Sequence, residues 1–252
     1  MTSQATPADI VAAFAYVVDT VAGRYGPRSQ AALIAKYEFL LTLLDLRHRS
    51  DFNPGLSDLV EGLVADLQHH YRTSAINLGG SSYCRVISDS PPLIEYDRDY
   101  YELRYSRTGE KVRNALIEVM RSTATHLQRL KPYVYVIDEA ERLIVYRVPL
   151  RLDDVVLGRN PAVAYEEMVF HPMLVHQALK VRVAGEITFI GSPDIVAAIA
   201  NTKSGHFKPP PSTGEVLQRV LQRDLGLAPD DVVVFTVFGA SIAESPGTVS
   251  RS

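Results

Sequence analysis

Residues 181–211 read VRVAGEITFIGSPDIVAAIANTKSGHFKPPP. Two apolar runs, 181–190 and 195–200, flank the tetrapeptide GSPD at 191–194, whose glycine, proline and aspartate favour tight turns. We therefore expect a strand, a turn and a returning strand. The second run leads into a loop that places Ser204, Gly205 and His206 ahead of three prolines. Because this loop presents a hydroxyl, backbone amides and an imidazole together, we look for chemistry here first.

Strand patterns continue on both sides of this stretch. Residues 133–137, YVYVI, predict a buried strand, and the polar turn DEAE leads into a second strand over 142–148. Shorter strands are expected at 83–87 and 100–106, and a hydrophobic one at 231–238. A long amphipathic helix over 110–130 is expected to cover one face of the sheet. The sequence STGE at 212–215 resembles a capping box in front of a helix over 216–225.

The first 73 residues have helical periodicity. A helix begins after Thr6 with a proline in its first turn and continues to residue 23. Two further helices are expected over 29–46 and 57–71, and the former is apolar on nearly all sides, so it should be buried. The fold class is therefore α+β: a mixed or antiparallel sheet flanked by helices and preceded by a helical unit. We expect a helical unit over 1–73 and an α+β domain over 83–240, packed as one globule.

Composition excludes several classes of protein. A net charge of −3 and a pI near 6.2 provide no global attraction for nucleic acid or an anionic membrane, so we expect no membrane partner. The single cysteine, Cys84, excludes an intrachain disulfide framework and fits a small, half-buried apolar residue. The amino terminus lacks the pattern of an export signal. We expect a cytoplasmic protein, and secretion without a cleavable signal stays open.

Two other polar features give weaker signals. The sequence GGSS at 79–82 has the backbone amides of an anion-binding loop but neither the spacing nor the lysine of a nucleotide-binding loop, so a linker is the simpler interpretation. His171, His176 and Glu186 lie close in sequence but lack metal-ligand spacing, and we expect no metal site. An imidazole packed at a strand end is the expected role of His176.

A resemblance is carried by five short segments in order: Tyr135 to Asp138, Phe170-His171, Ala184-Gly185-Glu186, Asn201, and Ser204-Gly205-His206-Phe207 with Pro209. This succession resembles a domain of bacterial toxin-like or effector proteins and the carboxy-terminal half of plant IQ-motif calmodulin-binding proteins. The match covers about residues 133–237. Pro172 and Met173 stand where the pattern has serines, and Phe207 replaces its tyrosine. The chain has no IQ motif, so calmodulin binding is not implied.

These residues suggest a site for glycosidic chemistry. A carboxylate on a strand, facing imidazoles and loop amides, is suited to stabilising an oxocarbenium-like centre, as in transfer of ADP-ribose from NAD. We expect Glu186, His171 and His206 to be catalytic. Residues expected to hold NAD, the co-substrate, are Asn201, Lys203, Ser204, Gly205 and Lys208. The toxin or effector setting of the resembling domains favours an ADP-ribosyltransferase or NAD-cleaving enzyme acting on an unidentified protein or nucleic-acid acceptor.

Other interpretations stay open. Glu186 is otherwise a solvated residue at a strand edge, and Lys203 and Lys208 are otherwise solvated lysines. Ser204 otherwise caps a structural turn in which Phe207 packs on the core. At the level of function, the alternatives are a non-catalytic module that binds an anion or a protein, and a nuclease or other hydrolase that uses His171 and His206.

Overall fold

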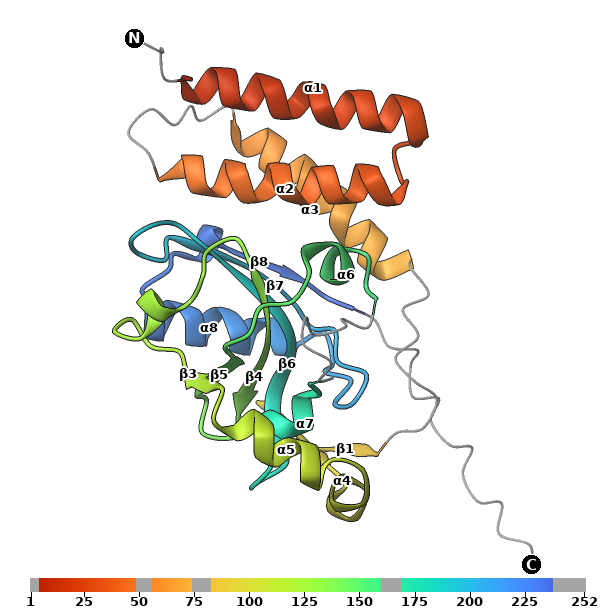
Figure 1. The fold of residues 1–252 in the computed structure, drawn as a ribbon, viewed down its shortest axis with the longest axis vertical. Helices are drawn as coiled ribbons and strands as arrows, with labels where there is room; N and C mark the ends of the chain where they lie inside the picture. Colours follow the sequence, from red (N-terminus) through yellow and green to blue (C-terminus); the bar gives the residue numbers. More distant parts are fainter. Residues whose placement is uncertain (1–4, 49–55, 74–82, 160–168, 238–252) are drawn as a thin grey trace, which may run out of the picture.

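The computed structural model describes residues 5–48, 56–73, 83–159 and 169–237 of the chain (Figure 1). Its centre is a mixed sheet of order β1-β2-β6-β4-β5-β3, with β7 on β6 and β8 on β7. The strands are β1 (Cys84–Asp89), β2 (Pro92–Tyr96), β3 (Leu116–Glu118), β4 (Pro132–Asp138), β5 (Leu143–Tyr146), β6 (Lys180–Ile190), β7 (Ala197–Asn201) and β8 (Val232–Phe235). Only β7 and β8 pair in parallel among these strands. The α+β class is confirmed.

Strand β6 holds the sheet together because both of its edges are used. Along one edge it pairs with β4, and along the other it pairs with β2 at its start and with β7 at its end. The expected strand, turn and returning strand are confirmed by the antiparallel register from Ile187 opposite Ala200 to Ile190 opposite Ala197. Gly191 has a φ of 106°, a conformation that favours glycine, and Val196 donates a backbone hydrogen bond to Ile190 (2.8 Å).

Side chains of β7 alternate between two hydrophobic clusters, one on each face of the sheet. Ala198 and Ala200 pack with helix α8 (Thr213–Leu225), whose buried stripe includes Leu217 and Leu221. Ala197 and Ile199 face the opposite way, toward the amino-terminal helices. The period of two in a strand therefore decides which residues of this region lie beneath those helices.

The amino-terminal helices form one packed unit on that second face, and the three predicted helices are confirmed. They are α1 (Pro7–Tyr25), α2 (Gln30–Arg47) and α3 (Leu56–Thr73). In Figure 1, α2 lies between α1 and the sheet. Leu40, Leu43 and Leu44 of α2 are fully buried, because this helix contacts α1, α3 and the sheet together. No helix of the described residues is both long enough and apolar enough to cross a membrane.

The predicted strand over 100–106 and the predicted helix over 110–130 are both wrong. Residues 98–113 form two short helices, α4 (Arg98–Arg104) and α5 (Ser106–Arg113), and Asp97 begins α4 by accepting the backbone N–H of Tyr100 (2.7 Å). The apolar residues after them form β3, which pairs with β5, and a short 3-10 helix, η1 (Ala124–His126). Pairing across the sheet therefore overrides the helical spacing.

Three elements were not predicted from the sequence. They are strand β2 and two short helices, α6 (Leu152–Val156) and α7 (His171–Leu174). A further 3-10 turn, η2 (Pro229–Asp231), precedes β8. The side chain of Ser212 makes no capping hydrogen bond, and Thr213 donates its hydroxyl to the carbonyl of Pro210 instead (2.8 Å). The glycine-rich stretch 79–82 lies outside the described residues.

A glycine is required at position 185, where the chain leaving β7 passes directly over β6. A Cβ atom at this position would lie 1.9 Å from the backbone oxygen of Asn201. We expect Gly185→Ala to lower the free energy of unfolding by roughly 1–3 kcal/mol or more, measured by urea denaturation, because the backbone must shift to admit the methyl group.

Gly62, in the middle of α3, is the matched control because a Cβ there meets nothing within 4 Å. We expect Gly62→Ala to raise the free energy of unfolding by roughly 0.5–1 kcal/mol, since alanine is the better helix residue. Unchanged stability of Gly185→Ala would contradict the close approach of the two strands.

Candidate functional site

The carboxylate of Glu186 lies in the interior, on the most central strand of the sheet. Glu186 stands opposite Val134 of β4 and is only 3 % exposed. Successive side chains of a strand point to opposite faces, and Ile187 faces the cluster beneath α8. The side chain of Glu186 therefore points to the other face, toward the amino-terminal helices. The interpretation of Glu186 as a solvated residue at a strand edge is therefore wrong. Burial raises the pKa of its carboxyl group, and Lys203 and Asn201 partly oppose that rise.

Lys203 is the cation closest to this carboxylate. Its Nζ lies 3.7 Å from Oε1 of Glu186, and the side chains of the pair are 5 % and 2 % exposed, so the expectation of a solvated Lys203 is wrong. The same Nζ donates a hydrogen bond to the backbone oxygen of Arg159. Oε2 of Glu186 has no hydrogen-bond partner among the described residues. A buried carboxylate oxygen without a partner is costly, and it is the atom to which a ligand can donate.

Asn201 organises the backbone around the pair. Its Oδ1 accepts hydrogen bonds from the backbone N–H groups of Glu186 (3.1 Å) and Lys203 (2.9 Å). Its own backbone oxygen accepts from the hydroxyl of Tyr135 (3.1 Å). Asn201 is 2 % exposed, so its side-chain oxygen is committed to these two backbone groups and is not available to solvent.

Three buried tyrosines surround the carboxylate, and the sequence analysis missed all of them. The charge on Glu186 contributes to raising the pKa of Tyr37, Tyr71 and Tyr135, after the larger effect of burial. The hydroxyl of Tyr37 lies 3.3 Å from Oγ1 of Thr188, and Tyr71 donates to the backbone oxygen of Val155 (3.0 Å). Tyr37 and Tyr71 belong to α2 and α3, so the helical unit supplies part of the site. Tyrosines within apolar helices were the signal that could have revealed it.

His171 lies at the start of α7 with its ring fixed by the sheet. Its Nε2 is 3.1 Å from the carbonyl oxygen of Gly185, and because a carbonyl only accepts, Nε2 carries the proton. Burial is the main cause that lowers the pKa of His171 to about 3; the neighbouring His206 and Lys203 also lower it, and the hydrogen bond to Gly185 opposes the shift. At neutral pH the imidazole is therefore uncharged, with a lone pair on Nδ1.

The loop after β7 closes on itself. Oγ of Ser204 accepts the backbone N–H of Phe207 (3.2 Å), and the carbonyl of Ser204 accepts that of Lys208 (2.8 Å). Phe207 is 1 % exposed and belongs to the core. The structural interpretation is thus confirmed for Ser204 and Phe207. Gly205 and Lys208 are only half-buried, unlike Ser204 and Phe207.

His206 packs among aromatic rings. Its ring centroid lies 4.9 Å from that of Phe170, 5.7 Å from that of Tyr105 and 5.8 Å from that of Tyr96. Its Nε2 is 3.2 Å from the hydroxyl of Tyr105. Burial lowers the pKa of His206 to about 4, so this imidazole is also neutral at pH 7. The structure therefore brings Lys203 to Glu186 and His171 to the backbone of the neighbouring Gly185, whereas the contacts of His206 are with aromatic rings.

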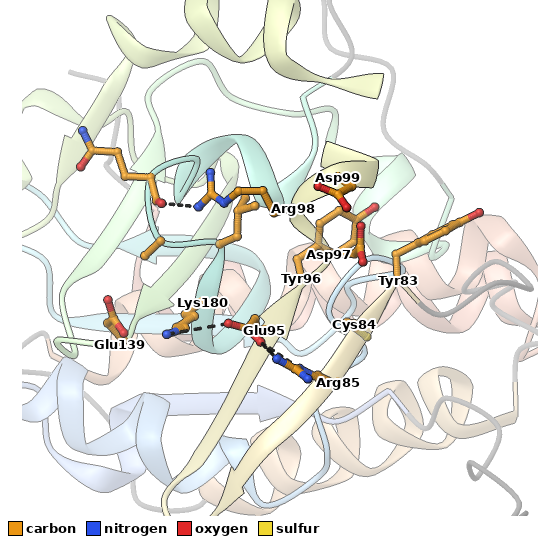
Figure 2. A pocket seen from close by; sticks show the side chains of 13 residues that line it. Tyr83, Cys84, Arg85, Glu95, Tyr96, Asp97, Arg98, Asp99, Glu139 and Lys180 are labelled. Carbon is orange, nitrogen blue, oxygen red and sulfur yellow. Dashed lines mark hydrogen bonds and ion pairs between the residues drawn. The ribbon is translucent and has the colours of Figure 1, made fainter. Parts of the chain in front are cut away.

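A separate cavity of about 790 Å³ lies where β6 begins (Figure 2). Arg85, Glu95 and Lys180 stand directly opposite one another on β1, β2 and β6, and Glu95 pairs with both cations. Cys84, half-buried as expected, lines this cavity and donates to the carbonyl of Phe207 (3.4 Å). The cavity therefore adjoins the loop of His206, but Glu186 does not line it. The sequence analysis did not identify this cavity, because its three charged residues are far apart in the sequence and only the pairing of the strands brings them together.

A metal centre is not built from the described residues. No three of their His, Cys, Asp and Glu side chains are placed to hold an ion. His176, expected to pack at a strand end, is half-buried, and its Nε2 has no hydrogen-bond partner within the described part of the chain.

Comparisons of the chain with protein-family models, with curated proteins and with solved structures gave no match. The resemblance of residues 133–237 to a domain of bacterial toxin-like or effector proteins therefore stays a prediction. The geometry itself defines the candidate site: a buried carboxylate with one oxygen that lacks a partner among the described residues, a lysine beside it, and a neutral His171 on the backbone of the preceding residue.

The burial of His171 predicts a pH dependence of stability. The unfolded histidine binds a proton near pH 6.5 and the folded one only near pH 3, so acid favours the unfolded chain. The stability that neutral His171 provides above pH 6.5 should be lost between pH 6.5 and 3, by about 1.4 kcal/mol per pH unit.

Urea denaturation between pH 7 and pH 4 measures this effect. His171→Gln keeps a donor for the carbonyl of Gly185 and should reduce the slope, whereas His126→Gln, at an exposed position, should leave it unchanged. An identical slope in wild type and His171→Gln would show that His171 is not held neutral.

Proposed function

We propose that this protein cleaves the bond between nicotinamide and ribose in NAD and transfers ADP-ribose to an acceptor, with Glu186 at the reacting sugar. The observation that supports this proposal is the Oε2 of Glu186, which is buried and unpartnered within the described residues. A ribose hydroxyl is a donor that fits this oxygen. The resemblance to effector-associated domains supports the same reaction class and a role as a bacterial toxin or effector.

The chemistry follows from the charge of the carboxylate. As the bond between C1′ and nitrogen breaks, its electron pair stays with nicotinamide and positive charge develops on the ribose. A carboxylate fixed in a site of low dielectric stabilises that charge more strongly than water does. The acceptor then forms a bond to C1′, and its proton passes to Glu186, whose raised pKa favours taking it.

The remaining candidate residues have three different roles. Asn201 and Ser204 hold the backbone in place, so their role toward a nucleotide is to position Glu186 and Lys203. Gly205 and Lys208 are only half-buried, so they are the members of the set through which we expect a phosphate to be contacted. His171 presents a neutral lone pair, which suits accepting a hydrogen bond from a sugar hydroxyl.

A non-catalytic binding module is the second candidate, and the burial of Glu186 favours it. With Glu186, Lys203 and Ser204 each under 5 % exposed, NAD contacts the carboxylate only when the surrounding elements separate. A module that binds a partner through the outer surface of the turn has no such requirement. A hydrolase based on two histidines is less well supported, since such a mechanism needs one protonated imidazole and both residues are neutral at pH 7.

The test is nicotinamide release from NAD by the purified protein, alone and with a cell lysate, together with label transfer to acceptors. We expect Glu186→Gln to lower the rate by about 100-fold or more, because the negative charge at the sugar is lost. The same change leaves the buried Lys203 without its counter-charge, which we expect to cost about 3–5 kcal/mol of stability.

Two variants separate activity from stability. Leu217→Ala, on the buried face of α8, should cost about 2–5 kcal/mol and keep its turnover below its melting temperature. Glu186→Gln with Lys203→Met should recover stability without recovering turnover, because neither charge is then left unpaired. Turnover retained in Glu186→Gln would overturn the role of the carboxylate. No release and no thermal shift with NAD in the wild type would favour the binding module.

A further inference from the structure

Helix α1 has an unusual composition for a helix at the surface. Its 19 residues, PADIVAAFAYVVDTVAGRY, contain three charged side chains, Asp9, Asp19 and Arg24, and none of its residues is buried. Surface helices of globular proteins normally carry charged and polar residues along the side that faces water. The outer side of α1 therefore lacks the character of a solvated surface.

Only one side of α1 has a partner within the described residues. Val11, Phe14, Ala15 and Val18 pack toward α2, and the ring of Phe14 stacks on that of Phe39 at 5.7 Å. In Figure 1, α1 lies at the edge of the molecule, with its other side turned away from α2. Tyr16 is 72 % exposed and Val17 is 47 % exposed at its centre. We call this side, with exposed Asp9, Ala12, Ala13, Tyr16, Val17, Thr20, Gly23 and Arg24, the outer face of α1.

We propose that the outer face of α1 packs against the same face of a second copy of this chain, with the two helices antiparallel. Two-fold symmetry requires a self-complementary surface, in which each contact occurs twice. Asp9 and Arg24 lie equally far along the helix from the midpoint between Tyr16 and Val17. An antiparallel pair centred on that midpoint places each Asp9 opposite the partner's Arg24, with the apolar centres in contact.

The local structure fits this pairing. Hydrogen bonds from Thr6 lower the pKa of Asp9, so its carboxylate is charged at neutral pH. A Cβ atom at Gly23 would meet nothing within 4 Å in the same chain, so the glycine leaves room for a neighbouring helix to approach. Antiparallel helices also place opposite ends of their dipoles together.

The charges of α1 favour a second copy over a lipid surface. Helices that lie on anionic membranes carry many lysines and arginines on their polar side, whereas α1 has Arg24 alone. A contact made chiefly by one helix per chain is at the low end of the area that stable dimers bury. We therefore infer a dimer whose population depends on protein concentration. This inference is independent of the reaction at Glu186.

Sedimentation velocity of the full chain over a concentration series measures the association. We expect a monomer–dimer equilibrium, and Tyr16→Glu should abolish it. Arg24→Asp should weaken the dimer by about tenfold or more, because two repulsive pairs replace two attractive ones. Asp9→Lys combined with Arg24→Asp should restore association relative to Arg24→Asp, since the swapped charges attract again.

Matched controls exclude general effects of charge. Leu103→Glu removes another exposed apolar side chain, 80 % exposed on α4, and Arg28→Asp reverses an exposed arginine just beyond α1. Both should dimerise like the wild type, and circular dichroism should show all variants folded. A wild type that stays monomeric at every concentration overturns the proposal, as does a dimer that Tyr16→Glu leaves intact. Failure of the charge swap to restore association overturns the antiparallel register.

Discussion

The close crossing of β6 and the end of β7 is the constraint on which the rest of the structure depends. The backbone oxygen of Asn201 lies where a side chain of residue 185 would begin, so only glycine permits the approach. That approach lets the side chain of Asn201 accept hydrogen bonds from the backbone of both Glu186 and Lys203. One amide oxygen thus fixes the two residues that carry the buried charges.

The buried charges in turn explain the surroundings of the site. Removing a carboxylate and an ammonium group from water costs several kcal/mol per ion, and their mutual attraction repays it only with further hydrogen bonds. Lys203 finds one at the carbonyl of Arg159, while Oε2 of Glu186 finds none among the described residues. A buried oxygen without a protein partner calls for an explanation, and this is the physical basis on which we propose a ligand contact there.

The three helices of the amino-terminal unit have different roles. Its inner helices, α2 and α3, bring Tyr37 and Tyr71 to the carboxylate, so they belong to the site as much as the sheet does. Its outermost helix, α1, contacts α2 on one side and exposes Tyr16 and Val17 on the other. A dimer through α1 would therefore place the association surface on the side of α1 that faces away from α2 and the sheet (Figure 1).

Local pattern by itself determined the three amino-terminal helices, the strands β4 to β8 in outline, and the turn between β6 and β7, because each is specified by periodicity and turn residues within a few positions. The local pattern predicted the wrong elements over 98–130. Residues there with helical spacing form β3 instead, because they pair with β5. Glu186 and Lys203 were identifiable as candidates, but their burial was not, because burial depends on helices more than 100 residues away. Only the tertiary structure decided which side chains surround the carboxylate, since no local rule brings Tyr37, Tyr71 and Asn201 together.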